Sequence, residues 1–300
     1  MTNAAGQGWT GDATPRPPKI LIPKILILGG TTEASALAKK LAGRPEIDVV
    51  LSLAGRTAAP RPEPVATRIG GFGGAEGLAR WIAGNGITAV IDATHPFAAR
   101  ISANAASACR VGAVPLLAIR RPCWARQTGD DWIEVESVAA CVPALGEVPK
   151  TVFLTIGRQE LSVFAAAPQH AYLVRTIEPV GDALPVPRLT ELRARGPFTL
   201  EDEMRLMREA GITVLVTKNS GGAATYPKIE AARRLGLPVV IAQPPVLPDV
   251  ASVSDAEGAA EWLVEHVAGR ARFPSRQGGG ERVVSANTLS ASAEPGPSRR

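Results

Sequence analysis

The decapeptide ILILGGTTEA, residues 25–34, sets the fold of this chain. Its four aliphatic residues predict a buried β-strand, and Gly29 and Gly30 form a turn into a helix that we expect over Glu33–Leu41. Backbone N–H groups and the positive end of the helix dipole meet at such a turn, which makes it a site for a phosphate. The dinucleotide fingerprint G-x-G-x-x-G/A is kept except at its middle glycine, which is Thr31 here. A glycine turn without a ligand has the same local sequence, so the motif alone leaves both interpretations open.

The net charge of +5 gives little support to nucleic-acid binding, because it lies at the two ends of the chain. Residues 1–23 carry a net +1 and residues 270–300 a net +4, so the segment between them is neutral. Aromatic residues make up 4% of the chain, which argues against base stacking. Both ends are rich in Gly, Pro, Ser, Arg and Ala, and we expect them to be disordered extensions.

Cysteine usage and hydropathy predict a cytoplasmic protein without a metal site or a membrane partner. Cys109, Cys123 and Cys141 form no C-x-x-C pair and show no metal-ligand spacing with histidine, which is typical of reduced thiols in a cytosol. The N-terminus lacks a basic segment followed by an apolar one, and no apolar run is long enough to span a membrane.

Short β-branched runs alternate with Ala-, Leu- and Arg-rich helical patterns, which is typical of parallel α/β layers. The first series of predicted strands is Lys24–Leu28, Val49–Leu53, Ala66–Ile69, Ala89–Asp92, Pro115–Ile119 and Trp132–Val135, with helices at Glu33–Leu41, Ala75–Asn85 and Ala98–Val111. The second series is Val152–Ile156, Ala171–Val174, Thr213–Thr217 and Pro238–Ala242, with helices at Leu200–Ala210, Tyr226–Leu235 and Ala256–Val267. We therefore predict two doubly wound α/β domains, residues 24–136 and 137–269, between the extensions 1–23 and 270–300.

The end of the second predicted strand favours NADPH over NADH. An NAD site expects an acidic residue there for the ribose hydroxyls, whereas this chain has Arg56 followed by Thr57, which suit a 2′-phosphate. The alternative is a solvated loop arginine. A glycine cluster at residues 70–74 lets the backbone approach a ligand closely. The expected cofactor residues are Gly29, Gly30, Thr31, Thr32, Glu33, Ala54, Gly55, Arg56, Gly71, Gly73, Thr94, His95 and Pro96.

His95 lies in the turn Asp92-Ala93-Thr94-His95-Pro96-Phe97, which follows another buried strand. In a parallel sheet this turn lies at the same edge as the glycine turn, so His95 is expected to face the nicotinamide end of a cofactor. A lone histidine is more often structural, and we assign His170 and His266 to that class.

Several motifs, in order across residues 24–267, resemble those of the precorrin-6A reductase family. They are ILGGTTEA (27–34), SLAGR (52–56), DATHPFA (92–98), RPxW (121–124), TIGRQ (155–159), RTIEP (175–179), GPFT (196–199) and TKNSGG (217–222). The resemblance implies an enzyme of cobalamin biosynthesis that uses NADPH to reduce one double bond of the precorrin-6A macrocycle, giving precorrin-6B. It implies two Rossmann-like domains, the first binding NADP and the second the substrate, with the macrocycle in the cleft between them. Family members act on the metal-free ring or on its cobalt complex, and these motifs do not separate the two.

A precorrin carries many carboxylates, which need cationic or N–H-rich partners. The predicted strand ends offer such groups, and we expect a carboxylate-binding rim made of Arg120, Arg121, Arg158, Arg175, Lys218, Asn219, Ser220 and Gly221. Each of these alone is more often a solvated group, and their gathering at one predicted edge is what favours binding. Beyond the tetrapyrrole we expect no nucleic acid or membrane partner, and transient contact with neighbouring pathway enzymes.

The expected chemistry is direct hydride transfer from NADPH, with the proton supplied by His95, by Lys218 or by solvent. A short-chain dehydrogenase needs Tyr-x-x-x-Lys, which neither Tyr172 nor Tyr226 provides. The remaining alternatives are a sensor that binds NADP without turnover, and a reductase of another small molecule. The sensor leaves the charged strand ends of the second half unexplained.

Overall fold

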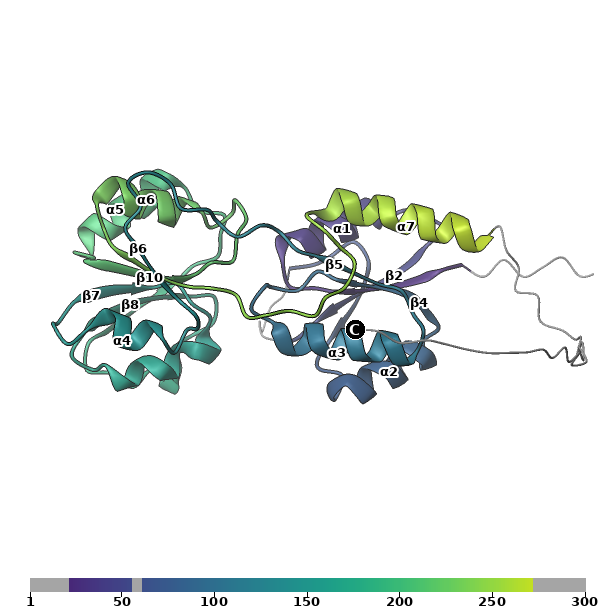
Figure 1. The fold of residues 1–300 in the computed structure, drawn as a ribbon, viewed down its shortest axis with the longest axis horizontal. Coiled ribbons are helices and arrows are strands. Elements are labelled where there is room, and N and C mark those ends of the chain that lie inside the picture. The colour runs from purple at the N-terminus through teal and green to yellow at the C-terminus, as the bar shows by residue number, and fades with distance from the viewer. Residues whose placement is uncertain (1–21, 56–60, 272–300) are drawn as a thin grey trace, which may run out of the picture.

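The computed structural model describes residues 22–55 and 61–271, which form two α/β lobes (Figure 1). Each lobe holds a six-stranded sheet in which all neighbouring strands run parallel, so the predicted fold class is confirmed. The predicted N-terminal extension up to residue 21, the predicted C-terminal tail from residue 272, and Arg56 lie outside the described residues.

The first sheet is buried between helices on both of its faces. Its strands, in spatial order, are β12 (Ser252–Val253), β5 (Leu116–Ile119), β4 (Ile87–Asp92), β1 (Lys24–Leu28), β2 (Asp48–Leu53) and β3 (Ala66–Ile69). Its helices are α1 (Thr32–Leu41) and α7 (Ala256–Ala271) on one face, and α2 (Gly74–Gly84) and α3 (Ala99–Val111) on the other (Figure 1). Ile25 packs under α1 and α7, whereas Leu26 packs under α2 and α3. Burial on both faces explains why β1 is an unbroken aliphatic run.

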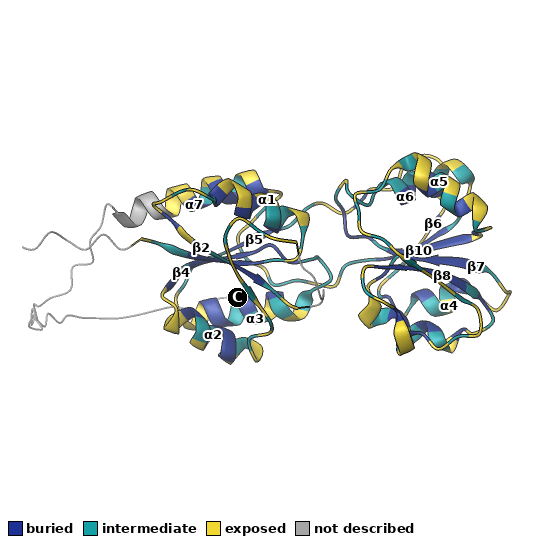
Figure 2. Cartoon of the chain, turned by 180° about the vertical axis from the view of Figure 1, so that it is seen from behind, coloured by how far each residue is buried: buried dark blue, intermediate teal, exposed yellow. Residues whose placement is uncertain are grey.

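The second sheet has the same layered construction. Its strands, in spatial order, are β6 (Trp132–Val135), β11 (Val239–Ala242), β10 (Val214–Lys218), β7 (Thr151–Leu154), β8 (Ala171–Thr176) and β9 (Leu189–Arg193). The helices α5 (Leu200–Glu209) and α6 (Pro227–Leu235) cover one face, and α4 (Cys141–Leu145) with the 3-10 segments η1 (Arg158–Ala166) and η2 (Gly181–Ala183) covers the other. Figure 2 shows the buried sheets between helices whose outer faces are exposed.

The predicted domain boundary at residues 136 and 137 is wrong, because the chain crosses between the lobes twice. Strand β6 pairs with β11 and so belongs to the second sheet. Strand β12 pairs with β5, and α7 packs on α1 through Ala259 and Leu263, so the C-terminal part of the chain returns to the first lobe. The physical reason is that the apolar face of α7 completes the core above β1, a pairing that the local sequence of α7 does not specify. The two crossing segments follow β5 and β11 (Figure 1).

Two strands, β9 and β12, were not expected from the sequence. Both are edge strands with mostly exposed or half-buried residues, so they lack the apolar run that marks the central strands.

Among residues 22–55 and 61–271, no helix combines the length and the apolar character that crossing a membrane requires. Within the same ranges no group of three or more His, Cys, Asp or Glu side chains is arranged to hold a metal ion.

Candidate functional site

The glycine turn between β1 and α1 is built as the sequence predicts. Gly29 packs so closely on β2 that a Cβ atom there would lie 2.5 Å from Leu51 Cδ1. Gly30 has φ +111°, and a Cβ placed on it would meet no atom within 4 Å, so this side of the turn is open. Thr31 is the N-cap of α1: its hydroxyl accepts from the Ala34 N–H at 3.2 Å and donates to the Ala93 carbonyl at 2.7 Å. That hydroxyl therefore ties the glycine turn to the end of β4 and accepts the Ala34 N–H, and the positive end of the α1 dipole favours an anion at this turn.

The carboxyl ends of β2 and β3 carry a cation that the sequence analysis missed. Arg68 of β3 lies opposite Ser52 of β2, and its guanidinium donates to Ser52 Oγ at 2.7 Å and to the Gly70 carbonyl at 3.0 Å. It stacks on the Phe72 ring at 3.8 Å, and burial lowers its pKa from the usual value. The neighbouring predicted residues fit this edge: Gly55 has φ +73°, and Gly73, with φ +79°, is the N-cap of α2. The signal available in the sequence was an arginine two residues before a glycine cluster.

The turn after β4 is held by a buried carboxylate. Asp92 is 1% exposed, accepts from the Thr94 hydroxyl at 2.6 Å, and pairs at 2.7 Å with Arg120, the residue that follows β5. Arg120 Nη1 is buried and has no hydrogen-bond partner among the described residues. The hydrogen bond from Thr94 to Asp92 thus stabilises the turn, while one buried donor of Arg120 stays without a partner.

His95 and Lys218, predicted as candidate catalytic residues, are linked through Phe97. The His95 ring lies 5.8 Å from the Phe97 ring, and Phe97 N–H donates to His95 Nδ1 at 3.2 Å. Lys218, at the end of β10 in the other lobe, places its Nζ 4.8 Å from the centre of the Phe97 ring and forms an ion pair with Glu160. Because Phe97 also packs against the core of the second lobe, the carboxyl edges of the two sheets meet at this point.

Arg121 contacts both lobes from the first crossing segment. Its Nη1 donates to the two carboxylate oxygens of Glu33 at 2.8 and 2.9 Å, and its Nε donates to the Ser220 carbonyl at 2.6 Å. Burial acts to raise the pKa of the Glu33 carboxyl, but hydrogen bonds, above all from Arg121, outweigh it and leave that pKa lowered. Gly221 has φ +64°, and a Cβ atom on it would lie 2.1 Å from the Pro122 carbonyl oxygen.

Asn219 is committed to the same crossing segment. Its side chain is 3% exposed, accepts from Trp124 N–H at 2.8 Å and donates to the Trp124 carbonyl at 3.1 Å. Trp124 Nε1 donates in turn to the Gly222 carbonyl at 2.9 Å. The loop at residues 218–222 is therefore hydrogen-bonded to the segment after β5, and the Asn219 amide group is occupied by these bonds within the protein.

Arg175 does not lie on a solvent-facing rim. It is 8% exposed, pairs with Glu203 of α5, and stacks at 3.7 Å on Phe198 and at 4.9 Å on Phe153. Its charge is neutralised inside the second lobe by Glu203, so the fold already gives Arg175 a carboxylate partner. Lys228 of α6 belongs to the same buried group.

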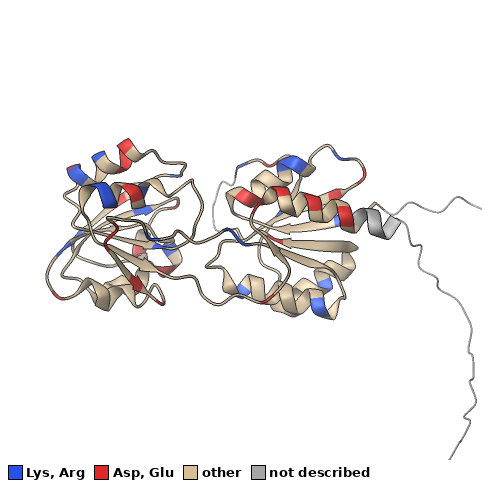
Figure 3. Cartoon of the chain, turned by 45° about the horizontal axis from the view of Figure 1, so that its top comes forward, with Lys and Arg blue, Asp and Glu red and all other residues tan. Residues whose placement is uncertain are grey.

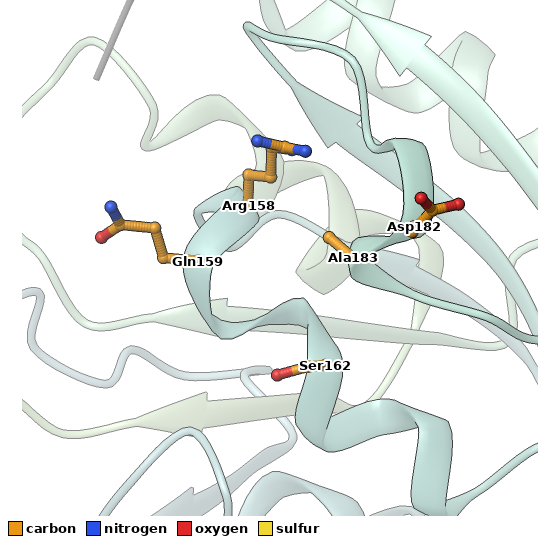
Figure 4. A pocket seen from close by; sticks show the side chains of 5 residues that line it. All are labelled: Arg158, Gln159, Ser162, Asp182 and Ala183. Carbon is orange, nitrogen blue, oxygen red and sulfur yellow. The ribbon is translucent and has the colours of Figure 1, made fainter. Parts of the chain in front are cut away.

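Arg158 lines an open depression on the second lobe (Figure 4). The depression has a volume of about 390 Å³ and is lined by Arg158, Gln159, Ser162, Asp182 and Ala183. Arg158 is exposed there, and its Nε donates to the Val180 carbonyl at 3.2 Å. Lys and Arg patches and Asp and Glu patches both occur on each lobe (Figure 3), so the positive groups act locally and not as one basic face.

The fold and these contacts define a class of protein. Two Rossmann-like lobes meet at the carboxyl edges of their parallel sheets, with a glycine turn on one side and Lys218 on the other. Ligands of open α/β sheets bind at such edges.

Comparison with known proteins identifies the family. The profile described as "Precorrin-6x reductase CbiJ/CobK" matches residues 24–264. A precorrin-6A reductase from a Sinorhizobium species is 52% identical, covering 80% of this chain and 94% of its own length. One from Rhodobacter capsulatus is 49% identical, covering 81% and 96%. The solved structure of a CobK precorrin-6A reductase has a TM-score of 0.78 at 48% identity, covering 81% and 97%.

The chain belongs to the precorrin-6x reductase family. The resemblance inferred from the motifs is confirmed, and so is the class of enzyme, an oxidoreductase of cobalamin biosynthesis. A nicotinamide cofactor is consistent with this family.

Proposed function

We propose that this protein reduces one double bond of the precorrin-6A macrocycle with NADPH and so yields precorrin-6B. The observation that carries the proposal is the meeting of the two sheet edges at Phe97 and Lys218, in a chain of this family. The glycine turn, which suits a pyrophosphate, lies at the same edge of the first sheet as the His95 turn. When bound, NADPH would supply a hydride to one ring carbon, and a proton would go to the carbon at the other end of the double bond.

The first lobe has features that fit a dinucleotide. The open side of Gly30 and the positive end of the α1 dipole suit the pyrophosphate. Thr31 fixes this turn against Ala93, two residues before His95, so the pyrophosphate and nicotinamide positions are held in one register. The task of these residues is to hold the reacting atoms at a short, aligned distance.

The proposal of NADPH in place of NADH rests on Arg68, together with Arg56. The Arg68 guanidinium lies over the Phe72 ring at the ends of β2 and β3, where an NAD enzyme places a carboxylate for the ribose. A guanidinium there attracts a 2′-phosphate.

We expect Arg68→Met to weaken 2′,5′-ADP binding roughly tenfold or more, because a charge-assisted hydrogen bond contributes about 1.5–3 kcal/mol. Isothermal titration of 2′,5′-ADP and 5′-AMP measures this. The exposed Arg80→Met on α2 is the matched control. Equal losses for both nucleotides would mean that Arg68 only supports the turn.

The proton route has two protein candidates. His95 accepts at Nδ1 from Phe97 N–H, so a neutral ring carries its proton on Nε2. Lys218 is held by Glu160 and by the Phe97 ring. Among the predicted rim arginines, the exposed Arg158 keeps donors for a substrate carboxylate, whereas the unpartnered Nη1 of Arg120 is buried.

The test is anaerobic incubation with precorrin-6A and NADPH, following the ring chromophore and the nicotinamide absorbance together. Loss of one NADPH per shifted ring supports the reductase. A repeat with the cobalt-loaded ring distinguishes the two substrates. Binding of NADPH without reduction of either ring would refute the proposal and favour the NADP sensor.

A further inference from the structure

The Arg121 guanidinium contacts both lobes at once. Arg121 contacts Glu33, in the first turn of α1, and the Ser220 carbonyl, in the loop after β10. The side chains of Arg121 and Glu33 are 16% and 20% exposed, so the ion pair is shielded from solvent more than a surface pair is. A planar fork with fixed N–H directions transmits orientation as well as charge.

The loop after β10 is shaped to receive this side chain. A Cβ atom on Gly222 would lie 3.3 Å from Arg121 Cδ, and one on Gly221 would lie 3.4 Å from Arg121 Cγ. The side chain therefore lies against the backbone of these two glycines. Lys218, four residues before Gly222, contacts Phe97 on the other lobe. The position of this loop thus fixes Lys218 relative to the first lobe.

Glu33 also raises an electrostatic problem that Arg121 resolves. A carboxylate in the first turn of α1 lies beside the helix end that suits a pyrophosphate, and two anions there repel each other. Pairing with Arg121 neutralises Glu33, so the turn keeps its attraction for a phosphate.

We propose that Arg121 is a positioning residue and not a substrate ligand: it holds the cofactor turn and the Lys218 loop in register for hydride transfer and neutralises Glu33 beside the cofactor phosphates. The inference rests on the proposed function for its kinetic consequences, and its electrostatic and geometric consequences are independent of the substrate.

The kinetic test compares Arg121→Met, Arg121→Lys, Glu33→Gln and the double variant R121M/E33Q. We expect R121M to weaken NADPH binding, and R121M/E33Q to restore it, because the unpaired carboxylate is then gone. We expect R121K to keep NADPH binding through its charge but to lower the single-turnover rate of hydride transfer roughly ten- to a hundredfold, because a small misplacement of the reacting atoms has that effect. Arg126→Met is the control, since Arg126 lies in the same crossing segment and its ion pair with Glu134 is half exposed.

The geometric test needs no substrate. Spin labels are attached to cysteines introduced at the exposed positions 80 on α2 and 205 on α5. The exposed Cys123 is first replaced by serine, so that it takes no label. Double electron–electron resonance then reports the distance between the lobes. We expect one narrow distance in the parent protein and a broader distribution in R121M. An unchanged distribution, or R121M affecting only the KM for the ring, would overturn the proposal. Failure of the parent to reduce either ring would refute the proposed function alone, since NADPH affinity and lobe distance would still test the role of Arg121.

Discussion

Lys228 makes the unfolding free energy of this protein depend on pH in a predictable direction. Its side chain is buried, donates from Nζ to the Thr225 carbonyl at 3.0 Å, and lies 4.8 Å from the Trp124 ring. Burial lowers the pKa of Lys228 from 10.5 to about 7, and repulsion from Arg175 and Arg121 acts the same way, while Glu203 opposes it. We therefore expect Lys228 to be only partly protonated at neutral pH.

The sign follows from proton binding in the two states. Between pH 7 and pH 10.5 the unfolded chain binds the Lys228 proton more tightly than the folded chain, so stability rises as pH rises. For these two pKa values, the free energy of unfolding increases by about 1.5 kcal/mol from pH 7 to pH 8.5. The range from pH 7 to pH 8.5 lies below the range in which the buried thiols change the free energy of unfolding. Burial raises the pKa of Cys109 and Cys141 to about 12, so these thiols favour unfolding at higher pH.

Urea unfolding of the parent protein and of Lys228→Met at pH 7, 7.5, 8 and 8.5 measures this effect. We expect the parent to gain stability across the series and Lys228→Met to change much less. At pH 7 we expect Lys228→Met to be the more stable, because an apolar side chain of similar length avoids the cost of a buried charge. The exposed Lys39→Met on α1 is the control. Parallel pH profiles for the parent and Lys228→Met would refute the reasoning, since Lys228 would then be charged in both states.

Two further substitutions test the contact between the two lobes and the source of the proton. Gly221→Ala combines a φ of +64° with a contact at 2.1 Å to the Pro122 carbonyl oxygen, and we expect its melting temperature to fall further than that of Gly146→Ala, where φ is +72° but a Cβ meets no atom within 4 Å. His95→Ala should lower kcat for the ring about a hundredfold and remove one limb of the pH–rate profile if this imidazole delivers the proton. An unchanged kcat in that variant would assign the proton to Lys218 or to solvent.

Local patterns were sufficient for the central elements of both sheets. Strand β1 has the bounds that the sequence predicted, and β11 begins one residue after its predicted start, because an aliphatic run between turn residues has one stable use in a parallel sheet. The glycine turn was predictable for a similar reason: Gly29 is needed where the chain packs on Leu51, a requirement that comes from the βα turn itself. The family motifs made the His95 turn and the Lys218 loop predictable as well.

The sequence by itself determined the glycine turn, the family and every strand except β9 and β12. The tertiary structure decided which lobe each terminal element joins and what each charged residue does. Glu33 and Arg121 are 88 residues apart, and Asn219 and Trp124 are 95 apart, so no local pattern pairs them. Arg175 and Arg158 both follow strands that were predicted from the sequence, yet one is neutralised in the core and the other is exposed. The physical reason is that periodicity reports which faces of an element are buried, whereas a charge takes its role from the partner that folding places beside it.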